Sequence, residues 1–357
     1  MHISRKIDSI AAGNTLKGIA ISVVLVNHYL NLNFAGDRTG FANLWISVFF
    51  ILSGFGLFNS LDRLLASGFT VSGLVEFYYE RSTRVFPLLW MAWLIESFVS
   101  GGRISFWILL GIHGTAHYWF IPALLQCYLL SPFIYMGMRK NRAVTITVII
   151  AVLAIINYLL MGNHVPSMIA KLGDFVNCEW RGAYFLYVVF FAVGLWYSDL
   201  AVRKKSDSGP DRKMGKAAWF WASAVGILLL MIVLKRYSHS SMFFEWAFQV
   251  GPLFPIALLC GLGLRNQIGN SLFSFLGSIA YSMYLFHMSF YLVLNSITDV
   301  QEDSISKVFL ALAGFPAFIF VCYRFEQLGI SISNRLRALI QGNPAQRQRN
   351  VIDSWGS

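Results

Sequence analysis

Lys17-Gly-Ile-Ala-Ile-Ser-Val-Val-Leu-Val-Asn-His28 is the stretch of sequence that decides how the rest of the chain is interpreted. Mostly apolar residues separate the two basic ones, and uncharged sequence continues to Gly36, as is typical of a membrane span. The separation corresponds to roughly three helical turns, so Lys17 and His28 share one face, about 16 Å apart along the axis. An ionisable side chain at membrane depth is costly and indicates a functional site.

Two roles fit His28 at this position. A neutral imidazole beside Asn27 can accept a proton in a water-filled cavity, which is the role of a catalytic base. It can also bond to a neighbouring helix and serve packing alone. Spacing leaves both roles open.

The composition indicates a polytopic membrane protein. Of 357 residues, 57% are hydrophobic and only 13% are charged, with a mean hydropathy of +0.60, more apolar surface than a water-soluble domain can bury. A net charge of +11 in such a chain indicates positive cytoplasmic loops, and we expect no nucleic-acid partner. The four cysteines follow no paired spacing, so we expect no disulfide framework and no metal site: Cys127, Cys178, Cys260 and Cys322.

Hydropathy predicts an all-α bundle of about ten transmembrane helices. We expect a short cytoplasmic head at 1–16, a transmembrane domain at 17–326 and a cytoplasmic tail at 327–357, with a charged loop at 62–84 and a short interfacial or re-entrant segment at 104–117. The predicted spans are 18–34, 44–61, 85–100, 118–138, 143–161, 182–200, 217–234, 242–263, 271–295 and 307–324. Ser53 and Gly54 in the second span are small enough to let another helix approach closely.

The distribution of basic residues predicts the orientation. With the N-terminus in the cytoplasm, 21 of the 28 Lys and Arg residues fall in inner segments and 7 in outer ones. This bias predicts that both termini are cytoplasmic.

Arg81 and Arg84 stand three residues apart at the start of the third predicted span, so they share a helix face at the inner membrane surface. Two adjacent guanidinium groups suit a phosphate or pyrophosphate. They also suit lipid phosphates, as a positive-inside anchor, and the spacing itself favours that role.

Further polar residues lie at the fourth and ninth predicted spans. His117 and Trp119 open the fourth, where an aromatic cluster serves either as an interfacial anchor or as a platform for a sugar ring. In the ninth, hydroxyls and an imidazole inside one apolar run predict a lined cavity, to which we assign Tyr281, Ser282, Tyr284 and His287.

Six stretches in sequence order together resemble membrane acyltransferase family 3, over about residues 11–330. They are Lys17 with His28, Phe49-Phe-Ile-Leu-Ser-Gly-Phe55, Arg81-Ser-Thr-Arg84 before Val85-Phe-Pro87, Trp119-Phe-Ile-Pro-Ala-Leu-Leu-Gln-Cys-Tyr-Leu-Leu-Ser-Pro132, Ser282-Met-Tyr-Leu-Phe-His287 and Tyr323-Arg-Phe-Glu326.

The resemblance implies a ten-helix enzyme of the bacterial inner membrane that transfers acetyl from acetyl-CoA to a hydroxyl of a cell-surface polysaccharide or its lipid-linked sugar precursor. It makes His28 the candidate base, and Arg81 and Arg84, with Lys17, the contacts to acetyl-CoA. We place the saccharide acceptor near His117, Trp119, Tyr281, Ser282, Tyr284 and His287. Acetyl-CoA is a substrate, so no permanently bound cofactor is expected, and the sequence gives no oligomeric state.

The chain differs from many members of this family in two features. Leu124 and Leu125 occupy a region where many members carry a glutamate pair, so we expect no carboxylate to act there. With these leucines the chain looks more like the branch resembling fucose and poly-N-acetylglucosamine O-acetylases. We also expect no hydrolase-like domain after the last span, and so no acyl relay through one. The alternatives are a transporter or flippase of a lipid-linked sugar, for which inverted repeats would be expected, and a sensory or scaffold membrane protein, which would leave the polar residues of the first and ninth spans unexplained.

Overall fold

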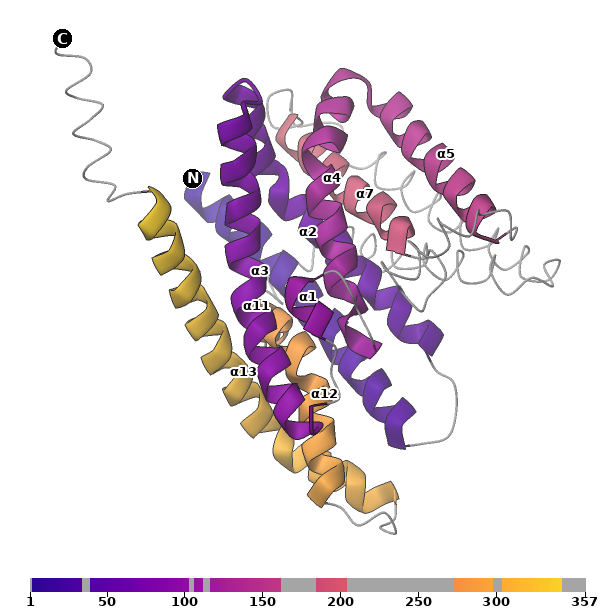
Figure 1. Ribbon diagram of the computed structural model, residues 1–357, viewed down its shortest axis with the longest axis vertical. Coiled ribbons are helices and arrows are strands. Elements are labelled where there is room, and N and C mark those ends of the chain that lie inside the picture. The colour runs from indigo at the N-terminus through magenta and orange to yellow at the C-terminus, as the bar shows by residue number, and fades with distance from the viewer. Residues whose placement is uncertain are drawn as a thin grey trace.

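The computed structural model describes residues 2–33, 39–102, 106–111, 116–161, 184–203, 272–297 and 304–341. Within these ranges the chain is helical throughout and contains no strand, as predicted (Figure 1). The α-helices are α1 (His2–Asn33), α2 (Thr39–Ala66), α3 (Val71–Val99), α4 (Phe120–Lys140), α5 (Arg142–Met161), α7 (Tyr184–Arg203), α11 (Leu272–Ser278), α12 (Ala280–Ile297) and α13 (Ser304–Gln341). Two 3-10 helices, η1 (Phe106–Leu110) and η2 (Ala116–Trp119), fall where a short interfacial or re-entrant segment was expected.

The apolar helices are those of a membrane protein. Three stretches of the described residues are long and apolar enough to cross a bilayer: Trp45–Ala66, His117–Lys140 and Ser306–Leu339. The outward side chains of α13 are apolar and exposed, as on a helix that faces lipid: Phe309, Leu312, Phe320 and Leu328. The predicted spans at 217–234 and 242–263 lie outside the described residues.

The predicted charged loop at 62–84 is wrong. α2 continues to Ala66 and α3 begins at Val71, so the connection is short. It turns through Gly68 and Phe69, which have φ of 81° and 56°, and Thr70 caps α3 by accepting from the Gly73 N–H at 3.1 Å. The charged residues of this region lie on the helices, so they do not mark the ends of the helices.

The end helices are longer than the spans predicted for them. α1 begins at His2 and runs through the region assigned to a polar head, and α13 continues through the start of the assigned tail to Gln341. The ninth predicted span is two helices, because the chain breaks at Ile279 between α11 and α12. Ser278, the last residue of α11, donates to the Phe275 carbonyl of its own helix at 2.7 Å.

Glycines set the closest helix contacts. Gly54 of α2 and Gly194 of α7 each lie where a Cβ would fall on the backbone of the other helix, which confirms the predicted close approach at Gly54. Gly18 of α1 and Gly277 of α11 repeat the arrangement. The second contact fixes α1, which carries both Lys17 and His28.

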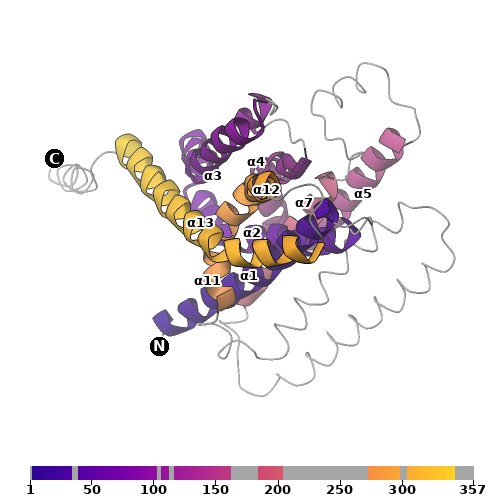
Figure 2. The same cartoon turned by 90° about the horizontal axis from the view of Figure 1, so that it is seen from below.

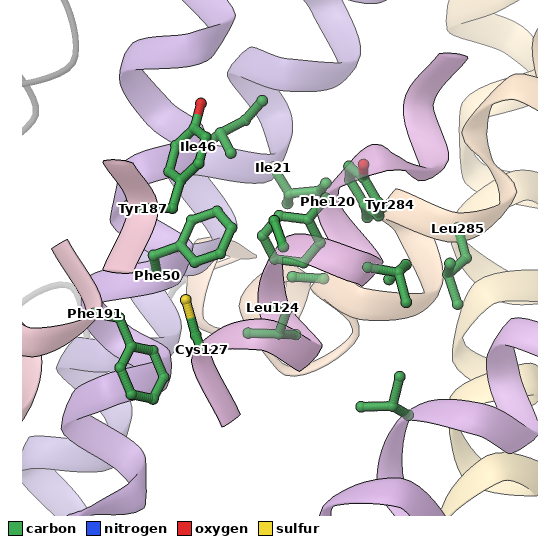
Figure 3. Packing of buried hydrophobic residues seen from close by; sticks show 14 of the residues in the cluster. Ile21, Ile46, Phe50, Phe120, Leu124, Cys127, Tyr187, Phe191, Tyr284 and Leu285 are labelled. Atoms are coloured by element: carbon green, nitrogen blue, oxygen red, sulfur yellow. The ribbon is translucent and has the colours of Figure 1, made fainter. Parts of the chain in front are cut away.

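α12 lies inside the bundle, packed against α1, α3 and α13, as Figure 2 shows from below. Its side chains from Ser282 to His287 are all buried. A row of aromatic rings connects α12 to the other side of the core (Figure 3). The ring centroids of Tyr284 and Phe120 are 4.9 Å apart, and those of Phe120 and Phe50 are also 4.9 Å apart. Phe50 in turn stacks on Tyr187, with 4.4 Å between the ring centroids. This packing holds the polar residues of α12 in place.

Candidate active site

Three histidines from separate elements meet in the bundle. The ring of His287 on α12 lies 5.0 Å from that of His28 on α1 and 5.0 Å from that of His117 on η2, edge-on to both. His117 and His287 are buried, and His28 is half-buried. We call these three residues the histidine cluster.

His287 has a fixed orientation. Its Nδ1 lies 2.6 Å from the carbonyl oxygen of Tyr284, and since a carbonyl only accepts, Nδ1 carries the hydrogen. The Nε2 atom of His287 is buried and has no hydrogen-bond partner. The Tyr284 hydroxyl donates to the backbone oxygen of His117, which ties α12 to η2. A neutral His287 therefore presents a lone pair to the interior of the site.

Glu96 of α3 contacts the histidine cluster, and our interpretation of the sequence missed it. Its Oε2 lies 3.3 Å from Nε2 of His117 and accepts a hydrogen bond from the Tyr118 hydroxyl at 2.9 Å. The contact with His117 has ion-pair distance without the alignment of a hydrogen bond, and Nδ1 of His117 is buried without a partner. The available signal was a carboxylate among the apolar residues of the third predicted span.

A second polar group lies on α1, α3, α12 and α13. Glu326 of α13 accepts from the Ser282 hydroxyl at 2.5 Å and from the Ser282 N–H at 3.3 Å. Glu326 also interacts electrostatically with Lys17 of α1 and Arg84 of α3. The Tyr281 hydroxyl closes the group by donating to the Val85 carbonyl at 3.0 Å. We call Lys17, Arg84, Ser282 and Glu326 the ionic cluster.

The two clusters are separated by helical rise. Along the helix axes, Lys17 and His28 are about 16 Å apart on α1, and Arg84 and Glu96 are about 18 Å apart on α3. On α12 the clusters come closer, with Ser282 and His287 about 8 Å apart. One layer thus carries two cations and a carboxylate, and the other carries three imidazoles and a carboxylate.

Arg81 and Arg84 have different surroundings despite their spacing. Arg81 pairs with Glu80 at 3.1 Å, donates to the Ser60 hydroxyl at 3.3 Å and lies over the Phe77 ring. Arg84 is exposed. Of the two guanidinium groups predicted to contact acetyl-CoA, the structure leaves Arg84 the more open to a ligand.

The predicted acceptor residues divide between the layers. His117, Tyr284 and His287 lie in or against the histidine cluster with His28, whereas Tyr281 and Ser282 lie with the ionic cluster. Trp119 is half-buried and its ring lies 5.4 Å from that of Tyr187, at the end of the aromatic row.

Comparison with known proteins identifies the family. The model of the acyltransferase 3 family, described as an acyltransferase domain, matches residues 10–325. Searches of curated proteins and of solved structures gave no match. The matched residues include both clusters except for Glu326, and they make up most of the chain. The chain therefore belongs to the acyltransferase 3 family and is a membrane acyltransferase.

Proposed function

We propose that this acyltransferase transfers an acetyl group from acetyl-CoA to a hydroxyl of a cell-surface polysaccharide or its lipid-linked sugar precursor. In this proposal it is a ten-span protein of a bacterial inner membrane, with both termini in the cytoplasm. The distribution of Lys and Arg along the sequence supports that orientation.

The ionic cluster supports an anionic donor. Lys17 and Arg84 provide two cationic groups from α1 and α3, which both pack against α12, and Arg84 is exposed. Acetyl-CoA carries phosphates, which a guanidinium binds through paired hydrogen bonds and an ammonium binds as a point charge. Arg81 adds a third cation once a phosphate competes with Glu80 for it. The thioester end then extends toward the histidine cluster.

The histidine cluster supports proton transfer at the reacting atoms. His28 takes the proton of the acceptor hydroxyl as the hydroxyl oxygen attacks the thioester carbonyl, so that the O–H bond breaks and a C–O bond forms. The C–S bond then breaks, and the sulfur of CoA receives the proton. One acetyl group and one proton change places, and the proposal requires neither a metal nor a resident cofactor.

The acceptor side consists of residues at or beside the histidine cluster. Imidazole and phenol groups form hydrogen bonds with sugar hydroxyls, and an indole ring forms a face on which a sugar ring can lie. In the proposed complex these residues are His117, Trp119, Tyr284 and His287. We place Tyr281 and Ser282 nearer the donor, because both lie with the ionic cluster.

One observation carries the proposal: α1 presents Lys17 to a cationic layer and His28 to a layer of imidazoles within a single apolar bundle. Packing alone needs neither layer, because polar groups at membrane depth are costly. A reaction between a water-soluble anion and a group held within the membrane needs both.

The direct test uses labelled acetyl-CoA and sealed membrane vesicles of both orientations, prepared from cells that express the protein. We expect label to enter the saccharide fraction, and to do so from the face that bears the cytoplasmic loops. Absence of protein-dependent label in the saccharide and lipid-linked sugar fractions of both preparations would contradict the proposed substrates.

A further inference from the structure

Glu96 has no role in the proposed acetyl transfer, although it contacts the histidine cluster. The Glu96 side chain is 11% exposed and that of His117 is 1% exposed, so the pair is almost fully removed from solvent. A buried carboxylate is costly unless a partner of opposite charge or hydrogen-bond donors compensate it. Its compensation comes from the Tyr118 hydroxyl and from His117.

The reaction places a positive charge in the same region. When His28 takes the hydroxyl proton, the histidine cluster becomes cationic inside an apolar bundle. Charge that develops at low dielectric is stabilised most by a fixed opposite charge already in position. Among the described residues, Glu96 is the carboxylate in contact with this cluster, whereas Glu326 is bonded to Ser282 in the other layer.

We propose that Glu96 is the counter-charge of the histidine cluster and acts through His117 as a positioning residue. Glu96 lies 3.3 Å from Nε2 of His117, so Nδ1 is the His117 nitrogen farther from the carboxylate and open to a neighbour or substrate; neither nitrogen makes a hydrogen bond to the described residues. The carboxylate then stabilises the positive charge that His28 acquires and that His117, through its open nitrogen, can share. This inference rests on the proposed function, because it assigns a role within the same transfer step.

The geometry limits which groups can take part. The titratable side chains around His117 and His287 come from four elements: His28 and Tyr29 from α1, Glu96 from α3, His117 and Tyr118 from η2, and Tyr284, His287 and Tyr291 from α12. The tyrosines are neutral at physiological pH. Glu96 is thus the anionic member of the set.

The test is Glu96→Gln, which keeps the size and hydrogen-bonding capacity of the side chain and removes its charge. We expect kcat to fall about 10- to 100-fold, the loss typical of an interaction with a charged group, with the KM for acetyl-CoA unchanged. We also expect the acid limb of the pH–rate profile to move to lower pH, because without the carboxylate the cluster holds a proton less well. Glu76→Gln, an exposed change on the same helix, is the matched control and should leave all three quantities unchanged.

Two further variants separate a catalytic effect from a structural one. Tyr118→Phe removes the other polar contact of Glu96 but keeps its charge, so it should cost less activity than Glu96→Gln. Adding Glu96→Gln to His117→Ala should change kcat by less than about threefold, because Glu96 acts through His117.

Two results would overturn the inference. One is a Glu96→Gln enzyme with wild-type kcat and an unshifted acid limb. The other is a full loss that persists in the His117→Ala background. Failure of the wild-type protein to transfer acetyl would instead contradict the proposed function, so the two failures are distinguishable.

Discussion

Replacing Ser282 with alanine should destabilise the bundle through the ionic cluster. The Ser282 hydroxyl lies 2.5 Å from a carboxylate oxygen of Glu326, and Ser282 has no exposed surface. The substitution leaves that oxygen with the backbone N–H of residue 282 at 3.3 Å, a longer bond. Alanine removes one oxygen atom, so the effect reports the lost hydrogen bond more than a cavity.

The size of the effect follows from the charge of the partner. Hydrogen bonds to charged groups contribute about 1.5–3 kcal/mol, so the equilibrium between folded and unfolded protein should shift by about 10- to 150-fold. The assay is reversible unfolding in mixed lipid–detergent micelles, followed by tryptophan fluorescence.

Ser296→Ala is the matched control, because Ser296 lies on the same helix, is exposed and donates to the Val293 carbonyl of its own helix at 2.8 Å. It should change the free energy of unfolding by less than about 0.5 kcal/mol. In a Glu326→Gln background, Ser282→Ala should cost less than in the wild type, because the charged acceptor is gone. Equal stabilities of the Ser282→Ala and Ser296→Ala proteins would refute the reasoning.

Three other outcomes follow from the structure. Arg84→Ala should raise the KM for acetyl-CoA about tenfold or more, and Arg84→Lys should raise it less. Arg81→Ala should have a smaller effect on this KM, because Arg81 is already paired with Glu80. Equal KM values for wild type and Arg84→Ala would argue against a phosphate contact. A chain ending at Gln341 should transfer acetyl at the wild-type rate per folded molecule, since it keeps all of α13, and lost activity at normal membrane levels would assign a function to the removed residues. Gly277→Leu should lower stability by about 1–3 kcal/mol or prevent assembly, because its Cβ would fall on the Asn14 backbone, whereas normal unfolding would show that α1 and α11 can separate freely.

The sequence predicts the helical class and most element positions because hydropathy reports directly on the bilayer. The predicted helix ends are wrong where a helix continues through charged residues. Asp62 and Glu76 fell within the predicted loop at 62–84, yet Asp62 lies on α2 and Glu76 lies on α3. The break at Ile279 was also missed, because the hydropathy of residues 271–295 continues across it without a change.

Sequence spacing predicts some of the residue contacts in the candidate site and not others. Lys17 and His28 share a helix, so their relation was predictable from helical geometry. His28 and His287 are far apart in the sequence, and no local pattern indicates that their rings lie 5.0 Å apart. Glu96 was missed because a carboxylate near the end of a predicted span resembles a boundary residue until tertiary packing places it against His117.

The central claim is that His28 performs proton transfer in the acyltransferase reaction, and turnover of His28→Gln tests it most directly. Glutamine keeps hydrogen bonding but cannot take a proton at neutral pH. With saturating acetyl-CoA and rates normalised to folded protein, across about pH 5.5–8, we expect a loss of about 10²–10⁴-fold. A His28→Gln protein that turns over within a few-fold of wild type at every pH would contradict the account and move the base to His117 or His287.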